Sequence, residues 1–431
     1  MDDKNVAARR ARWSRPGGLR SLIRQLGPGL ITGAADDDPS GIATYSQAGA
    51  AFGYAMGWTV VLSLPFMVAV QMISARIGRI TGHGLASALR AHAPRPLLAF
   101  IVGLLVIANV INLGADIGAM AAVTHLLIGG PENFYAVVLA LFCAAAEIWL
   151  AYQRYVRLLK WLTLSLLAYI ALLFVVEVSW WDALRGALWP QLDLTREAVT
   201  TLLAVLGTTI SPYLFFWQAA EEAEDELSED DPRPLREHAA DAPAQLHRIG
   251  LDTWIGMIYS NLVALAIVIG TAATLHAHGV TNIASAADAA AALKPLAGPF
   301  AQLIFALGIF GTGLLAVPTL AGSVAYAVGE SFDWTVGLSR LALQARAFYV
   351  TLAGATLIGT GIVFSPIDPM KALFWAAVIN GAAAAPMIVA MVVLGSKPSV
   401  MGSLTLPRGL RALGWATALL MGLGTLGVLL I

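Results

Sequence analysis

Three aspartates and a proline interrupt the first long apolar stretch of the chain. Asp36, Asp37 and Asp38 are followed by Pro39 and, two residues later, by Gly41, about halfway through a segment long enough to cross a bilayer. A carboxylate at membrane depth costs about 2.5–3.5 kcal/mol on insertion scales, and proline and glycine both interrupt helices. Because a broken helix at mid-membrane is tolerated where it lines a cavity, this run predicts an ion or substrate site in a transporter.

A second proline interrupts the sixth apolar stretch. Pro212 is preceded by Thr208, Thr209 and Ser211 and is followed by Tyr213. The two broken stretches start five spans apart, and an odd spacing gives a second five-helix unit the opposite orientation in the membrane. Inverted repeats of this kind place their broken helices together at the midplane. We therefore expect the two breaks to meet.

The predicted site consists of oxygen donors in a negative field. The first half-helix is expected to end near Ala35, where free carbonyls and the negative end of the helix dipole lie beside Asp38. The sixth stretch would add carbonyls and hydroxyls from Thr208, Thr209, Ser211 and Tyr213. Hard divalent cations such as Mg²⁺ and Mn²⁺ prefer oxygen ligands, and no sulfur ligand here favours a softer metal.

Several of these residues have a structural interpretation that stays open. Asp38 is also suited to cap the second half-helix, with or without a metal contact. Asp36 and Asp37 either bind the hydrated ion through water along an aqueous path or are simply solvated. Ser211 is equally a polar packing residue, and Tyr213 is equally a cavity wall.

Other polar residues in the apolar stretches and loops give weaker signals. Asn112 and Asp116 in the third stretch either line the path or form hydrogen bonds across the bundle. Glu147 receives no role. His276 and His278, two residues apart in an external loop, are more typical of a surface than of a metal site. No catalytic triad or phosphate loop lies in a soluble segment, so we expect no enzyme and no resident cofactor.

The composition is that of an integral membrane protein. Of 431 residues, 58% are hydrophobic and 12% are charged, and the mean hydropathy is +0.74; soluble domains carry about 25% charged residues. The net charge of −1 and the lack of a basic patch among aromatics give no sign of nucleic-acid binding. The expected partners are the lipid bilayer and a divalent cation, and the oligomeric state is left open, a monomer being one option. The single Cys143 excludes a disulfide within the chain and is expected to be a core residue.

Eleven apolar runs are long enough to span a membrane. They are 27–50, 54–78, 97–127, 133–152, 158–178, 197–221, 250–274, 297–328, 347–365, 370–394 and 410–430. With a cytoplasmic N-terminus, 22 of the 26 lysines and arginines fall on the inner side, which favours eleven spans and an extracytoplasmic C-terminus in an inner membrane. The polar residues 1–24 lack the apolar core of a signal peptide.

These spans give a predicted domain organisation. A cytoplasmic tail (1–24) precedes a first repeat (25–180), a second repeat (195–395) and a final loop with helix 11 (396–431). The second repeat contains a cytoplasmic loop, 222–248, whose start is strongly acidic. We interpret this loop as a solvated extension of the sixth helix, or alternatively as a vestibule that collects cations.

The chain resembles the Nramp divalent-metal transporters. Residues 27–29 read Gly-Pro-Gly, residues 38–41 read Asp-Pro-Ser-Gly, and residues 48–54 contain Ala-Gly-x-x-Phe-Gly-Tyr, like the first helix of that family. Residues 71–86 and 251–261 resemble its second and seventh helices. The resemblance covers roughly residues 25–395. It implies an all-α polytopic membrane protein with a LeuT-type 5+5 inverted repeat, broken helices 1 and 6, eleven transmembrane helices and cation transport.

The departures from the family pattern narrow the expected function. Asp38 falls on the family's metal-binding aspartate, whereas Gly41 replaces its asparagine ligand. Residues 211–213 read Ser-Pro-Tyr where the family has Met-Pro-His, which removes the thioether ligand and the histidine tied to proton movement. Asn112 and Ala115 stand where the family has two acids on its proton path.

The resemblance therefore implies a divergent branch similar to the magnesium-carrying relatives. We expect a secondary transporter of Mg²⁺ or Mn²⁺ that works by alternating access with weak or absent proton coupling. Two alternatives remain at this point. One is a carrier of a small organic amine or amino acid on the same fold, with Asp38 pairing with an ammonium group. The other is a membrane metal sensor without transport.

Overall fold

The computed structural model describes residues 27–149, 152–191, 195–227, 233–237, 239–283, 285–365 and 369–430, and its regular structure is entirely helical over those residues. The α-helices are α3 (Pro28–Asp36), α4 (Pro39–Phe52), α5 (Gly57–Thr81), α6 (Leu85–His92), α7 (Arg95–Ile128), α8 (Glu132–Trp149), α9 (Tyr152–Leu162), α10 (Leu167–Leu172), α11 (Trp180–Leu188), α12 (Arg196–Thr209), α13 (Pro212–Leu227), α14 (Ala242–Thr274), α15 (Ala286–Ser331), α16 (Arg346–Val363), α17 (Pro369–Ser396), α18 (Pro398–Met401) and α19 (Arg408–Leu430).

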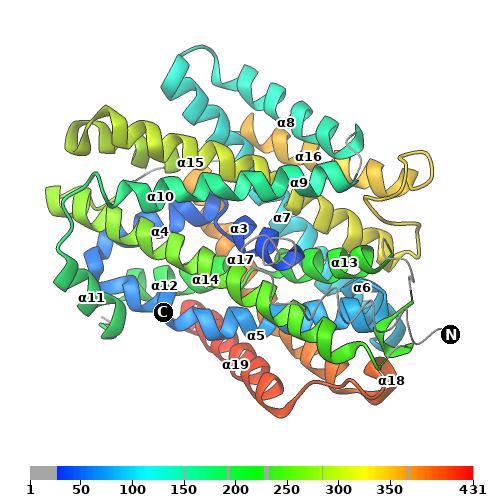
Figure 1. The fold of residues 1–431 in the computed structure, drawn as a ribbon. Helices are drawn as coiled ribbons and strands as arrows, with labels where there is room; N and C mark the ends of the chain where they lie inside the picture. Colours follow the sequence, from blue (N-terminus) through cyan, green and yellow to red (C-terminus); the bar gives the residue numbers. More distant parts are fainter. Residues whose placement is uncertain are drawn as a thin grey trace.

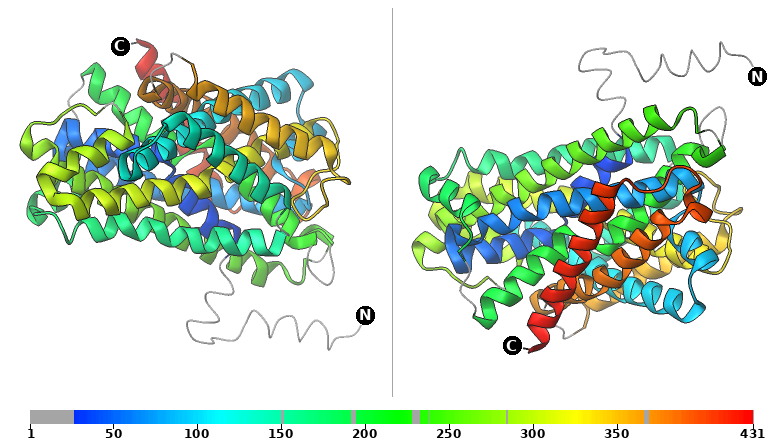
Figure 2. Two further views of the ribbon diagram at one scale, coloured as in Figure 1. Left: turned by 90° about the horizontal axis from the view of Figure 1, so that it is seen from above. Right: turned by 90° about the horizontal axis from the view of Figure 1, so that it is seen from below.

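The long helices form one bundle around the short helix α3 (Figure 1). α14 packs along α3, α4 and α5, whereas α7 packs along α15, α16 and α17. α8 and α19 lie on opposite sides of the bundle, as the two views of Figure 2 also show. Elements that are far apart in the sequence therefore surround the first helix break.

The predicted spans coincide with helical segments. Nine stretches of the described residues are long and apolar enough to cross a membrane, and one of them, Pro39–Thr81, contains both α4 and α5. The fifth predicted span falls on α9 and α10, which a 3₁₀ segment at Thr163–Leu166 joins. The number of eleven spans stays a prediction, as do the repeat boundaries.

Both helix breaks lie where the prolines predict them. α3 ends at Asp36 and α4 begins at Pro39, and α12 ends at Thr209 and α13 begins at Pro212. Each proline stands at the first position of its second half-helix, where its missing N–H costs no hydrogen bond. The breaks therefore end one helix and start the next within a few residues.

Three predicted boundaries differ from the structure, namely both ends of one loop and the start of the eighth span. The loop predicted at 222–248 is helical at both ends, because α13 continues to Leu227 and α14 begins at Ala242. The eighth span begins before residue 297, because α15 starts at Ala286 and bends at Gly298, whose φ of 87° lies in the left-handed region that favours glycine. The apolar pattern did not distinguish this short preceding helix from a loop.

Candidate functional site

Asp38 caps the second half of the first helix. Its Oδ1 accepts hydrogen bonds from the Gly41 amide and from the Ser40 hydroxyl, both at 2.6 Å. The capping interpretation is therefore confirmed. The residue is only 2% exposed, and its other oxygen, Oδ2, faces the hydroxyl of Tyr213 at 3.4 Å.

Tyr213 connects the two breaks through its hydroxyl. This group donates to the carbonyl oxygen of Ala35 at 2.7 Å and lies 3.4 Å from Oδ2 of Asp38. A carbonyl at the end of α3, a carboxylate at the start of α4 and a phenol from α13 are thus brought together. These three oxygens are the centre of the candidate site.

Gly41 allows α12 to approach the first break. A Cβ atom at this position would lie 3.0 Å from Cγ2 of Thr208 and 3.1 Å from the Asp36 carbonyl oxygen. Such contacts are tighter than ordinary van der Waals distances, so with a larger residue the neighbouring atoms would have to shift by a few tenths of an ångström. Gly41 thus contributes space, and Thr208 turns its methyl group toward that space.

The hydroxyls of Thr209 and Ser211 at the second break donate to carbonyl oxygens of α12. Ser211 donates to the carbonyl oxygens of Gly207 and Thr208 at 2.9 and 2.7 Å. Thr209 likewise lies 3.0 Å from the carbonyl oxygen of Val205. The Ser211 hydroxyl thus satisfies carbonyls that α12 leaves free at its end, whereas the Thr209 hydroxyl bonds to a carbonyl within the helix. Their predicted roles as cation ligands stay predictions.

Asp36 and Asp37 are buried at the end of α3. Their side chains are 1% and 0% exposed, so the prediction that they are solvated is wrong. The Ser260 hydroxyl on α14 donates to Asp36 Oδ2 at 3.0 Å. The remaining three carboxylate oxygens have no hydrogen-bonding partner among the described residues. Binding a hydrated ion along a path stays a prediction for both.

Asp116 links α7 to the same break. Its Oδ1 accepts from the Ser40 amide at 3.2 Å, which confirms a hydrogen bond across the bundle. Asn112, one turn earlier on α7, is also buried, and its Oδ1 has no partner in the part of the chain that the structure describes. Their predicted place along the ion path stays a prediction.

The start of α3 is held by a residue for which no role in the site was predicted. Asp252 on α14 accepts hydrogen bonds from the amides of Gly27, Gly29 and Leu30 at 2.9, 2.8 and 3.1 Å. These are amides that the first turn of a helix leaves without partners. A carboxylate in an apolar span was the available signal, but the sequence does not say which helix it caps.

The acidic end of α13 is buried rather than solvated. Glu222 forms an ion pair with Arg248 on α14. Glu224 accepts from the amides of Leu338, at 3.0 Å, and Ser339 and from the Tyr326 hydroxyl. The prediction that this segment is solvated is therefore wrong for Glu222 and Glu224, because these carboxylates contact neighbouring helices and the connection between α15 and α16. Residues 228–232 of the predicted loop lie outside the described residues.

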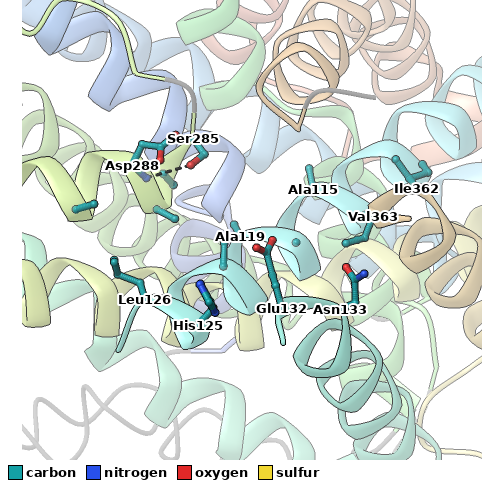
Figure 3. A pocket seen from close by; sticks show the side chains of 16 residues that line it. Ala115, Ala119, His125, Leu126, Glu132, Asn133, Ser285, Asp288, Ile362 and Val363 are labelled. Carbon is teal, nitrogen blue, oxygen red and sulfur yellow. Dashed lines mark hydrogen bonds between the residues drawn. The ribbon is translucent and has the colours of Figure 1, made fainter. Parts of the chain in front are cut away.

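A cavity of about 400 Å³ lies along the half of α7 that ends at Ile128 (Figure 3). Small side chains of α7 form one wall, starting at Ala115. Figure 3 shows Glu132 and His125 on one side and Asp288 on the other. Asp38 and Asp116 do not line this cavity.

A second cavity, of about 580 Å³, lies between the α5–α6 turn, α13 and the end of α15. Glu224 and Glu330 line it, and the ion pair between Arg90 and Asp333, at 2.5 Å, lies at its edge. The Arg90 guanidinium lowers the pKa of the Asp333 carboxyl, chiefly through this hydrogen bond. The residues of the first helix break do not line this cavity either.

The remaining predicted residues lie apart from the breaks. His276 and His278 are exposed, and their Nδ1 atoms contact the carbonyl oxygens of Ala50 and Thr274 at 2.8 and 2.7 Å. Cys143 is buried, as expected of a core residue. Glu147 is buried on α8, with no hydrogen-bonding partner among the described residues.

Within the described ranges, no three His, Cys, Asp or Glu side chains converge closely enough to hold a metal ion. A cation at the break would therefore depend on carbonyl and hydroxyl oxygens together with carboxylates. This matches the donor types gathered around Asp38.

The family model for natural resistance-associated macrophage protein-like (Nramp) proteins matches residues 29–430. The chain belongs to the Nramp family. The divalent metal cation transporter MntH of Klebsiella pneumoniae is 29% identical over 399 residues, which cover 91% of this chain and 90% of MntH. The resemblance inferred from the residues of the first helix is therefore confirmed.

Solved structures confirm the fold class. The manganese transporter of Eremococcus coleocola superposes with a TM-score of 0.75 at 18% identity, covering 96% of this chain and 88% of that one. Mhp1, a nucleobase-cation-symport-1 family transporter, gives 0.56 at 16% identity, with coverage of 94% and 92%. At these identities the similarity concerns the fold alone, which is the LeuT-type arrangement of a multi-pass membrane protein.

Proposed function

We propose that this chain carries divalent cations across the membrane by alternating access, with Mg²⁺ or Mn²⁺ as the substrate. The proposal rests on one observation: Ala35, Asp38 and Tyr213 bring a carbonyl, a carboxylate and a phenol together between two broken helices. A shared family with a divalent metal cation transporter supports the same substrate class.

The three oxygens suit a hard cation that keeps part of its water shell. The protein ligands would be the Ala35 carbonyl oxygen, Asp38 Oδ2 and the Tyr213 hydroxyl. Water would fill the remaining coordination positions. Mg²⁺ requires near-octahedral geometry, keeps several waters and usually binds through one or two carboxylates. Because Asp38 is almost fully buried, the helices must separate to admit the hydrated ion, as alternating access requires.

We further propose that transport has weak or no proton coupling. Ser211 and Tyr213 occupy the places of the family's methionine and histidine, and Asn112 and Ala115 those of its two acids. An inside-negative potential supplies about 2.3 kcal/mol per elementary charge per 100 mV. That is sufficient to drive the uptake of a doubly charged ion without protons.

The test is Mn²⁺ uptake into proteoliposomes, with Mg²⁺ as competitor. Asp38→Asn should abolish uptake, because it removes the charge and keeps the shape of the ligand. The matched control is Glu147→Gln, which changes another buried carboxylate outside the site and should transport like the unmodified protein. Uptake that survives in Asp38→Asn, or uptake of an organic amine instead of either ion, would contradict the proposal.

Proton coupling is tested in the same vesicles with a pH-sensitive dye inside. We expect metal entry without internal acidification beyond that of protein-free vesicles. Acidification that rises in proportion to metal entry would show that the ion and the proton move together.

We propose that the protein lies in an inner membrane, with its N-terminus in the cytoplasm and its C-terminus outside. The basic residues of the loops support it. Alkaline phosphatase fused after residue 431 should be active, because this enzyme folds only outside the cytoplasm; an inactive but stable fusion would reverse the orientation.

A further inference from the structure

The short helix α11 (Trp180–Leu188) lies outside the predicted membrane spans. It occupies part of the connection between the fifth and the sixth span and lies at one end of the bundle (Figure 1). Its 9 residues give a helix about 14 Å long, which is less than half of the roughly 30 Å of hydrocarbon that a span must cross. α11 therefore lies at the boundary of the membrane and does not cross it.

One face of α11 is large, apolar and exposed. With 3.6 residues per turn, positions 180, 181, 184 and 188 share an arc of about 100°. Tryptophans and leucines that are between 51% and 76% exposed occupy this arc: Trp180, Trp181, Leu184 and Leu188. Contiguous apolar surface with polar residues at its rim is typical of a protein or membrane interaction site. This face therefore calls for a partner.

A second face of α11 fixes how the helix is turned. Its residues are small and buried: Ala183, Gly186 and Ala187. A Cβ added at Gly186 would lie 2.1 Å from the Tyr54 carbonyl oxygen, and one added at Gly57 would lie 3.4 Å from the Ala187 backbone. α11 thus packs closely on the turn that joins α4 to α5. Since tryptophan and leucine side chains could not occupy this contact, the apolar face points away from it.

The surface beside α11 belongs to a membrane span. α11 packs against α5, and the stretch Pro39–Thr81, which contains α5, is long and apolar enough to cross the membrane. Val61 follows Gly57 by one turn on the same side of α5, and it is exposed, as is Leu62. The medium that covers these residues is lipid. The apolar face of α11 therefore begins where a lipid-facing surface ends.

The third face of α11 is charged. Asp182 and Arg185 lie between the apolar and the buried faces, and both are exposed. Tryptophan is enriched at the boundary between membrane and water, where its ring lies among the lipid headgroups. A helix with tryptophan and leucine on one face and charges on another is typical of a helix that lies in the plane of this boundary. The three faces thus suit protein, lipid and water.

We propose that α11 is an interfacial helix that lies in the headgroup region of the bilayer, with Trp180, Trp181, Leu184 and Leu188 against the lipid. The partner of this face is the lipid surface itself and not a second copy of the chain or another protein. Because α11 packs on the turn between α4 and α5, it joins the end of the first broken helix to the membrane surface.

The single cysteine allows a site-specific labelling test in proteoliposomes. In a Cys143→Ala background, a nitroxide label is attached at Trp181→Cys or at Leu184→Cys. The matched control is Ala277→Cys, because Ala277 is exposed in the turn His276–His278, which contacts the same helix α4. Electron paramagnetic resonance compares collisions of the label with oxygen, which concentrates in lipid, and with a nickel chelate, which stays in water on both sides of the membrane.

We expect the labels at positions 181 and 184 to collide with oxygen and to lose most of the nickel collisions that the label at position 277 shows. Nickel collisions as frequent as at position 277 would place the face in water and overturn the proposal. Protection from both reagents would mean that protein covers the face, and this would also overturn it. If one of the two variants does not fold, the other tests the same face.

Discussion

The two helix breaks use their polar groups in opposite ways. At the first break, Asp37 and one oxygen of Asp36 have no hydrogen-bonding partners among the described residues. At the second break, Ser211 and Thr209 donate to carbonyls of their own helix. A proline that breaks a membrane helix therefore does not by itself create a ligand. What distinguishes the first break is the set of oxygens that the protein leaves available.

The largest effect on Mn²⁺ binding is expected at Asp38. Asp38→Asn should weaken Mn²⁺ binding by more than about 100-fold, because even residues behind a ligand typically contribute 10–100-fold to metal affinity. Isothermal titration measures the change, and a thermal melt checks that the bundle remains folded. Binding within a few fold of the unmodified protein would remove the first break from the site.

A smaller effect is expected where the second break reaches the first. Tyr213→Phe removes the hydroxyl that contacts Ala35 and Asp38 and should reduce Mn²⁺ affinity about 10-fold. Tyr349→Phe is a suitable control, because its hydroxyl donates to the carbonyls of Leu338 and Arg340, away from the two breaks. Equal effects of the two variants would show that the loss at Tyr213 is one of general packing.

The contact between the breaks can be tested through its volume. Gly41→Ala adds a Cβ about 3 Å from Thr208 Cγ2 and should destabilise the bundle by about 1–3 kcal/mol, the usual effect of overpacking. Adding Thr208→Ser removes the methyl group and should recover part of the loss in a double-mutant cycle. If the changes in melting temperature of the two single variants simply add in the double variant, residues 41 and 208 do not interact.

The smallest effect is expected at Ser211. Ser211→Ala removes hydrogen bonds to the last turn of α12 and should cost about 1 kcal/mol of stability, while Mn²⁺ uptake should stay within about threefold. Denaturation and flux measured on one preparation separate the two quantities. A loss of uptake as large as that of Asp38→Asn would restore Ser211 as a direct ligand and make the two breaks equivalent.

The sequence was sufficient to predict the general fold because membrane-spanning helices require features that are local in the chain. Long apolar runs, two prolines in corresponding spans and the aspartates before Pro39 predicted a broken-helix transporter fold and placed both breaks. Asp38 followed by proline also predicted the helix cap that the structure contains. Each of these features depends on residues close together in the chain.

The sequence failed where partners are distant in the chain. The glutamates from Glu221 onward were interpreted as a solvated loop, because charge in a polar segment usually indicates exposure. Glu224 is instead bound to the connection between α15 and α16, more than one hundred positions away. For the same reason the sequence did not indicate that Asp252 caps α3, or that the Ser260 hydroxyl donates to Asp36.

The attachment of α3 to α14 has a consequence for how easily this half-helix can swing. Gly33 packs against the backbone of Gly256. A Cβ added at Gly33 would lie only 2.3 Å from the Gly256 carbonyl group. Two glycines have no side chains to repack, so parting them exposes little apolar surface. The hydrogen bonds that join α3 to its neighbours then resist the movement: those of its first amides to Asp252, and those of Ser260 to Asp36 and Tyr213 to Ala35 at its other end. Weakening the hydrogen bonds to Asp252 would therefore let the start of α3 separate from α14 more often.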